Sequence, residues 1–124
     1  MRPEVLYLTD IVEAANAIGR FLAGVEREAF LEDELRQSAV QQKLTVIGEA
    51  AARLPAEFQS RHPQVAWRKA VSLRNVTVHE YFSISWDTIW ATATQDIPLV
   101  RDQVAEILRQ IEPDAGQTGP QKPA

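Results

Sequence analysis

Residues 33–55 of the chain read DELRQSAVQQKLTVIGEAAARLP, and this stretch decides the fold class. Its apolar side chains recur at intervals of three and four residues, at Val40, Leu44, Ile47 and Ala51. Such spacing places these side chains on one face of an α-helix. Pro55 cannot continue that helix, because its ring clashes with the preceding turn. The stretch therefore predicts a helix that begins at residue 33 or 34 and ends at residue 54.

The same periodicity continues on both sides of this helix, and no stretch shows the strict alternation of a strand. The expected helices span about residues 4–23, 33–54, 65–78 and 97–111, with a further one after Ser85. Gly24 ends the first helix, and residues 55–66 form a connector with room for one helical turn. Ser85 is an expected N-cap, and Pro98 predicts a kink or break near Asp96. We expect an all-α fold, an antiparallel bundle of four to five helices.

The composition is that of an ordinary globular domain of 124 residues. We expect one helical domain over residues 1–112. A disordered tail should follow over 113–124, where three Pro and two Gly accompany no apolar side chain larger than Ala. The chain has no Cys, which excludes disulfides, cysteine zinc sites and thiol catalysis. The net charge of −4 excludes a bulk nucleic-acid coat protein. The sequence has no long apolar run and no signal-peptide layout, so we expect a cytoplasmic protein.

The most unusual stretch is 74–81, which reads RNVTVHEY. His is the side chain that most readily exchanges a proton near neutral pH, and Arg offers a fixed fork of donors to a phosphate. Asn can orient the imidazole or contact a phosphate oxygen. Arg74, Asn75 and His79 together suit metal-independent RNA cleavage, in which the neighbouring 2′-hydroxyl attacks the phosphodiester. On a continuous helix, Asn75 and His79 would lie side by side, one turn apart.

Structural explanations compete with the catalytic one for each of these residues. His79 could cap the last carbonyls of its helix, and Arg74 could pair with a buried carboxylate. Glu49 lies in mid-helix among small residues, where it could pair with Arg74, line a cleft or face solvent. The chain contains no Gly-rich phosphate loop, HExxH motif or paired-carboxylate metal site, so we expect no metal and no cofactor.

The string RNVTVHEY resembles the Arg-x4-His-x-Tyr signature of the HepT-like branch of the HEPN superfamily. Further segments are similar to that family in the same order: IGEA followed by RLP at 47–55, Trp67-Arg68, and WDTIW with DIP at 86–98. The resemblance covers about residues 5–111. Ala66 replaces the family's usual Pro before Trp67, and Thr77 replaces a frequent aliphatic residue. Neither departure changes a motif residue.

The resemblance implies an α-helical homodimer in which two motifs face each other across a composite cleft. It implies a toxin of a toxin–antitoxin module that cleaves RNA without metal, with Arg74 and His79 catalytic and Asn75 assisting. The usual partner is a minimal nucleotidyltransferase antitoxin, which in some systems attaches AMP to the motif Tyr, here Tyr81. Two alternatives are a non-catalytic HEPN module that holds a nucleotidyltransferase and a purely structural bundle. The intact Arg74, Asn75 and His79 favour the enzyme.

Overall fold

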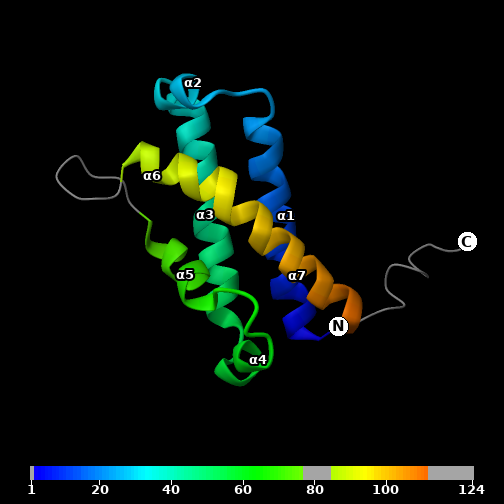
Figure 1. Cartoon of the computed structure of the whole chain (residues 1–124). Coiled ribbons are helices and arrows are strands. Elements are labelled where there is room, and N and C mark those ends of the chain that lie inside the picture. Colours follow the sequence, from blue (N-terminus) through cyan, green and yellow to red (C-terminus); the bar gives the residue numbers. More distant parts are fainter. Residues whose placement is uncertain (1, 77–84, 112–124) are drawn as a thin grey trace, which may run out of the picture.

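The computed structural model describes residues 2–76 and 85–111. These ranges are helical and contain no strand, which confirms the expected all-α class (Figure 1). The helices, in chain order, are α1 (Pro3–Leu22), α2 (Arg27–Leu31), α3 (Glu34–Arg53), α4 (Ala56–Arg61), α5 (Trp67–Ser72), α6 (Trp86–Ala91) and α7 (Ile97–Ile111). A 3₁₀ turn, η1 (Leu73–Asn75), follows α5, and a π-helical turn, η2 (Thr92–Asp96), joins α6 to α7.

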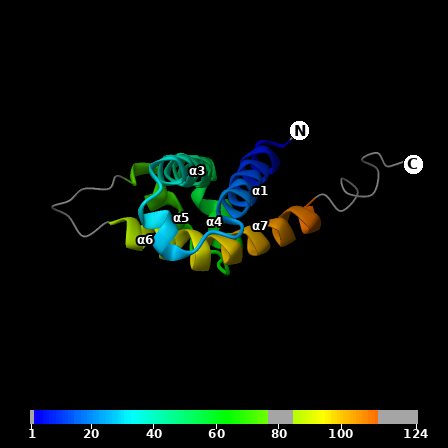
Figure 2. The ribbon, with the colours of Figure 1, turned by 90° about the horizontal axis from the view of Figure 1, so that it is seen from above.

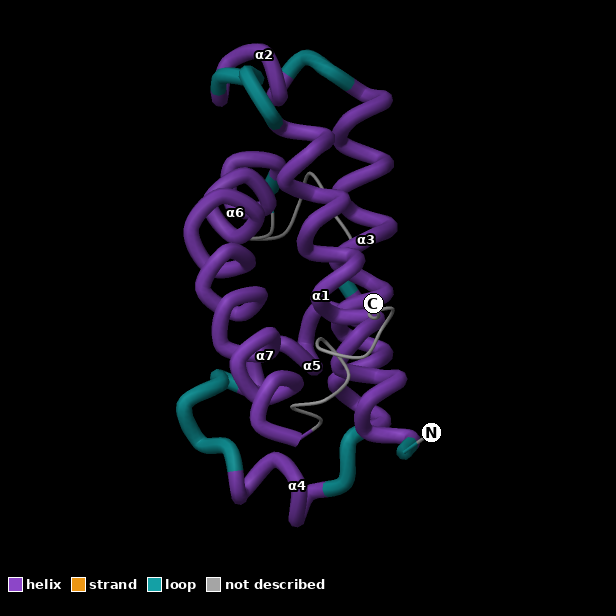
Figure 3. Tube along the Cα trace, turned by 90° about the vertical axis from the view of Figure 1, so that its right-hand side faces the viewer, coloured by secondary structure: helices purple, strands orange, loops and turns teal. Residues whose placement is uncertain are grey.

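Two long antiparallel helices, α1 and α3, form one side of the bundle. The continuous rod made of α6, η2 and α7 crosses them on the other side (Figures 1 and 2). The short helices α2 and α4 close the two ends of the bundle, as Figure 3 shows. The core lies where α1, α3 and α7 meet. Its fully buried side chains include Leu8, Ile11, Leu44, Ile47, Val104 and Ile107.

The ends of the two long helices agree with the sequence. Gly24, just after α1, has φ of 74°, a conformation that glycine adopts without steric cost. Asp33 is the N-cap of α3, and its carboxylate accepts a hydrogen bond of 3.1 Å from the backbone N–H of Arg36. This N–H and the guanidinium of Arg36 hold the pKa of the Asp33 carboxyl below its usual range. At the other end, Pro55 follows directly after Leu54, the C-cap residue.

Helix α2 was missed by the sequence analysis, and it fastens the start of α6 to the bundle. Its fully buried Phe30 packs edge-on against Trp86, with ring centroids 6.2 Å apart, and lies 5.3 Å from Trp90. Arg27 forms an ion pair with Asp87 across the same junction. Ser85 caps α6 as predicted, because its hydroxyl accepts a hydrogen bond from the backbone N–H of Thr88 at 3.3 Å.

The expected interruption near Asp96 takes the form of the π-helical turn η2, and the rod continues through it without a break. Pro98 lies in the first turn of α7 and has no N–H to donate to the turn before it, which fits this irregularity. The expected tail over 113–124 falls outside the described ranges. Within those ranges, no helix is long and apolar enough to cross a membrane.

Candidate active site

The first two residues of the 74–81 motif, Arg74 and Asn75, lie on η1, directly after the short helix α5. Trp67 begins α5, and its buried indole fixes the helix by donating from Nε1 to the carbonyl of His62 at 2.9 Å. The chain then tightens into η1, which carries Arg74 and Asn75. The position of both residues therefore depends on how α5 and η1 are held against the rest of the bundle.

Gly48 of α3 lets η1 lie directly on the backbone of that helix. A Cβ atom added at Gly48 would lie 2.0 Å from the backbone nitrogen of Arg74 and 2.6 Å from its Cα. No side chain fits in this space, so glycine is required by the close approach of two backbone segments. The contact fixes the backbone of Arg74 relative to the longest core helices.

A second contact to α3 holds the residue after η1. The side chain of Gln41 donates from Nε2 to the carbonyl of Val76 at 3.0 Å. Val76 has an extended backbone, with φ of −65° and ψ of 121°, and its own N–H donates to the carbonyl of Leu73 at 3.2 Å. The chain thus leaves the helical conformation at Val76.

This ending corrects the prediction of one helix over residues 65–78. The β-branched residues Val76, Thr77 and Val78 follow one another here, and such residues disfavour helix through restricted χ1 angles. The helical conformation ends before Val76, so the one-turn spacing of a continuous helix no longer places Asn75 and His79 side by side. His79 and Tyr81 themselves lie outside the described residues.

Arg74 and Asn75 are both exposed. Within residues 2–76 and 85–111, Arg74 forms no ion pair and no side-chain hydrogen bond. Arg74 therefore makes no buried pair with a carboxylate of the described residues. Glu49 is also exposed, although it follows Gly48, and it makes no ion pair with Arg74. The structure supports the solvent-facing interpretation of Glu49. No described residue uses the N–H donors of the Arg74 guanidinium, which are of the kind that bind an anion.

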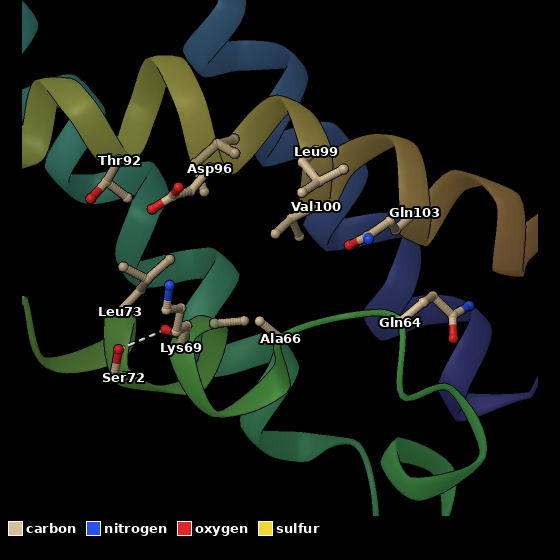
Figure 4. A pocket seen from close by; sticks show the side chains of 12 residues that line it. Gln64, Ala66, Lys69, Ser72, Leu73, Thr92, Asp96, Leu99, Val100 and Gln103 are labelled. Carbon is tan, nitrogen blue, oxygen red and sulfur yellow. Dashed lines mark hydrogen bonds between the residues drawn. The ribbon is translucent and has the colours of Figure 1, made fainter.

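A pocket of about 330 Å³ lies next to this turn, between α5 and the η2–α7 rod (Figure 4). Leu73 of η1 lines it, Lys69 lies on the α5 side, and Thr92 and Asp96 point into it from η2. This pocket was not predicted from the sequence. The interruption of the helical pattern before Pro98 was a sign of η2, the turn whose Thr92 and Asp96 line the pocket. Among the described residues, no group of His, Asp and Glu could hold a metal ion.

The other histidine, His62, has a structural environment. It is half-buried, and its ring centroid lies 4.6 Å from that of Phe58. Burial, and then the charge of Arg61, lower the pKa of His62 below its usual value. His62 lies outside the 74–81 motif, so it offers a control for the removal of an imidazole at His79.

Comparison with known proteins matches the family described as Ribonuclease HepT-like to residues 11–107, which include the whole 74–81 motif. A relative from Thermococcus cleftensis, named "Probable ribonuclease HepT", is 35% identical over 82% of this chain and 92% of its own length. A "Putative RNase" from Caldanaerobacter subterraneus subsp. tengcongensis is 34% identical over 83% of this chain and 92% of its own. Another from Methanocaldococcus jannaschii is 36% identical over 86% and 88%. No solved structure matches the chain. The chain therefore belongs to the HepT-like ribonucleases, endoribonucleases of the HEPN type.

Proposed function

We propose that this ribonuclease cleaves RNA without a metal ion, with Arg74 and His79 as catalytic residues and Asn75 assisting. The observation that carries the proposal is the setting of Arg74. Its backbone is held against Gly48 of α3, while its side chain is exposed and has no ion-pair partner in the described part of the chain. A guanidinium on a fixed backbone, with no ion-pair partner among the described residues, suits an anionic substrate, because its N–H donors can bind a phosphate without first breaking an ion pair in that part of the chain.

The proposed reaction uses the ribose next to the scissile bond. A neutral imidazole of His79 takes the proton from the 2′-hydroxyl, and the 2′-oxygen forms a bond to phosphorus. The bond between phosphorus and the 5′-oxygen breaks, and that oxygen receives a proton from a general acid. The products are a 2′,3′-cyclic phosphate and a 5′-hydroxyl. Arg74 stabilises the charge on the pentacoordinate phosphorus through paired N–H donors.

We further propose a homodimer as the active form, because the reaction needs both a base and an acid. One motif supplies one His, and two motifs related by a two-fold axis would supply both roles. A hydrodynamic mass of about twice 13.9 kDa at micromolar concentration would support this state. A stable dimer interface should bury at least about 1,000 Å² of accessible surface, counted over both subunits. A stable monomer at that concentration would contradict the proposal.

In the cell, we propose that the chain is the toxin of a toxin–antitoxin module, with a minimal nucleotidyltransferase as antitoxin. That partner would transfer AMP from ATP to Tyr81. The phenol oxygen forms a bond to the α-phosphorus of ATP and loses its proton. The bond between the α-phosphorus and the oxygen that bridges it to the β-phosphorus breaks, and pyrophosphate leaves. The attached phosphate would bring negative charge to the motif and compete with RNA for Arg74.

A growth experiment tests this function with a matched pair of histidine variants. The wild type, His79→Ala and His62→Ala are expressed from an inducible promoter, with and without any minimal nucleotidyltransferase that is encoded beside the gene. We expect growth arrest from the wild type and from His62→Ala, and normal growth with His79→Ala. The hydrogen bond from Trp67 goes to the backbone carbonyl of His62, so the alanine variant retains it. Equal growth of the wild-type and His79→Ala strains would contradict the toxin proposal.

A further inference from the structure

We propose that Gln41 is a positioning residue for the ribonuclease site: it fixes the chain at Val76 and thereby limits where His79 can lie. This inference rests on the proposed catalytic role of His79. Neither the family resemblance nor the motif points to Gln41, which lies 35 residues before Val76 on a different helix.

The hydrogen bond that carries the inference has an unambiguous direction. Gln41 is partly buried on α3, and its amide lies 3.0 Å from the carbonyl oxygen of Val76. A backbone carbonyl can only accept, so the NH₂ group of the amide must face it. The N–H of Val76 is occupied by the carbonyl of Leu73. Both polar backbone groups of Val76 are therefore held in place.

Gln41 and Gly48 act on the same short segment from the same face of α3. They are seven residues apart, about two helical turns, so both face η1. Between them, Thr45 donates from its hydroxyl to the carbonyl of Gln41 at 3.2 Å. Gly48 holds the backbone at Arg74, and Gln41 holds it at Val76. Two separate points of attachment fix both the place and the direction in which the chain leaves η1.

The attachment at Val76 matters because it leaves fewer residues between a fixed point of the backbone and His79. His79 follows Val76 by three residues and Arg74 by five. An extended chain spans at most about 3.6 Å per residue, so fixation at Val76 confines the His79 backbone to a radius of about 11 Å, against about 18 Å from Arg74. The accessible volume is about fourfold smaller with the Gln41 bond. Loss of one such hydrogen bond should correspondingly cost several-fold in the rate of the chemical step.

Two variants of identical composition test this role. Gln41→Glu keeps the shape of the side chain but replaces the donor by a carboxylate, which repels the Val76 carbonyl. Gln42→Glu adds the same charge one residue further along α3, at an exposed side chain with no hydrogen bond to the described residues. We expect Gln41→Glu to lower kcat about fivefold with little change in KM, since Arg74 stays fixed by Gly48. We expect Gln42→Glu to match the wild type.

The pH dependence separates positioning from general damage. Below its pKa, the introduced carboxyl is protonated and can again donate to the Val76 carbonyl. An unperturbed glutamate has a pKa of about 4.3, so the ratio of kcat between Gln41→Glu and wild type should stay low from pH 8 to about 6 and rise toward one only as the pH falls to about 4. Gln41→Lys, which keeps a donor, should restore most of the activity at all pH values. A ratio that stays constant with pH, with no rescue by Lys, would overturn the positioning role.

Hydrogen exchange provides a readout that needs no catalysis. In Gln41→Glu, peptides that contain residues 73–76 should exchange faster than in the wild type, and in Gln42→Glu they should not. Unchanged exchange in both variants would overturn the attachment itself. Faster exchange with unchanged kcat would overturn the positioning role while leaving the ribonuclease proposal intact. A wild-type protein that cleaves no RNA would instead overturn the proposed function, and the exchange result would still decide whether Gln41 holds Val76.

Discussion

Gly48→Ala is expected to disturb the site from within the core. The new methyl group would lie 2.0 Å from the backbone nitrogen of Arg74, and it would also lie 2.6 Å from the carbonyl carbon of Leu73. Ordinary van der Waals contact begins near 3.4 Å, so α3 and η1 must separate by about 1.4 Å. The obstructing atoms are backbone, which cannot rotate away as a flexible side chain can.

The expected loss of stability follows from two opposing terms. Overpacking of this kind costs up to about 3 kcal/mol, and alanine gains about 1 kcal/mol over glycine in a helix interior. The net loss is about 2 kcal/mol, or about 8 °C in Tm for a domain of this size. Catalysis should suffer more, since a displacement of about 1 Å in a catalytic group can reduce the rate about a hundredfold.

Gly19→Ala is the matched control. Gly19 lies on the exposed face of α1, and an added Cβ would meet nothing within 4 Å. This variant should gain about 0.5–1 kcal/mol and keep full activity. The stability of Gly48→Ala and Gly19→Ala is compared by thermal melts followed by circular dichroism. Their activity is compared by RNA cleavage at a temperature well below the Tm of both variants. If Gly48→Ala melted at or above the wild-type temperature with full activity, the close contact between α3 and η1 would be refuted.

Other variants probe individual contacts. Arg74→Lys keeps the charge but loses the paired donors, so it should cleave RNA at least tenfold more slowly at unchanged Tm. The control Arg109→Lys, at an exposed position, should cleave at the wild-type rate. Equal rates for Arg74→Lys and the wild type would show that Arg74 does not stabilise the transition state. Ser85→Ala loses the α6 cap and should cost about 1 kcal/mol in a denaturant titration, and a loss below about 0.3 kcal/mol would contradict that role. Tyr81→Phe should remain toxic but gain no AMP-sized mass with the partner, ATP and Mg²⁺; modification that persists would exclude Tyr81 as the acceptor.

Most of the fold was predictable because the long helices carry their own signals. The apolar period of α3, its Asp33 cap and Pro55 locate that helix from local sequence alone, and Gly24 does the same for the end of α1. Helix α2 was not predictable in this way. It has five residues, too few to show the apolar spacing of a helix. Its stability depends on the contact of Phe30 with two tryptophans more than 50 residues later in the chain.

The site was only partly predictable for a similar reason. Arg74 and Asn75 were found as chemistry-bearing residues, but the end of their helix is set together with contacts from Gly48 and Gln41 across the bundle. A helical wheel drawn through residues 65–78 cannot show such contacts, and it wrongly carried the helix past Val76. The roles of His79 and Tyr81 remain predictions from the motif.

Cleavage of a defined RNA by the purified protein in the presence of EDTA tests the proposed chemistry most directly. The substrate is compared with one that carries a single 2′-deoxyribose at the cleaved position, and the wild type is compared with His79→Ala and His62→Ala. We predict cutting by the wild type and His62→Ala, products that end in a 2′,3′-cyclic phosphate, and no cutting at the 2′-deoxy position. The rate should fall at least about a hundredfold in His79→Ala. Cleavage that stops in EDTA, or that His79→Ala performs as fast as the wild type, would contradict a metal-independent reaction driven by His79.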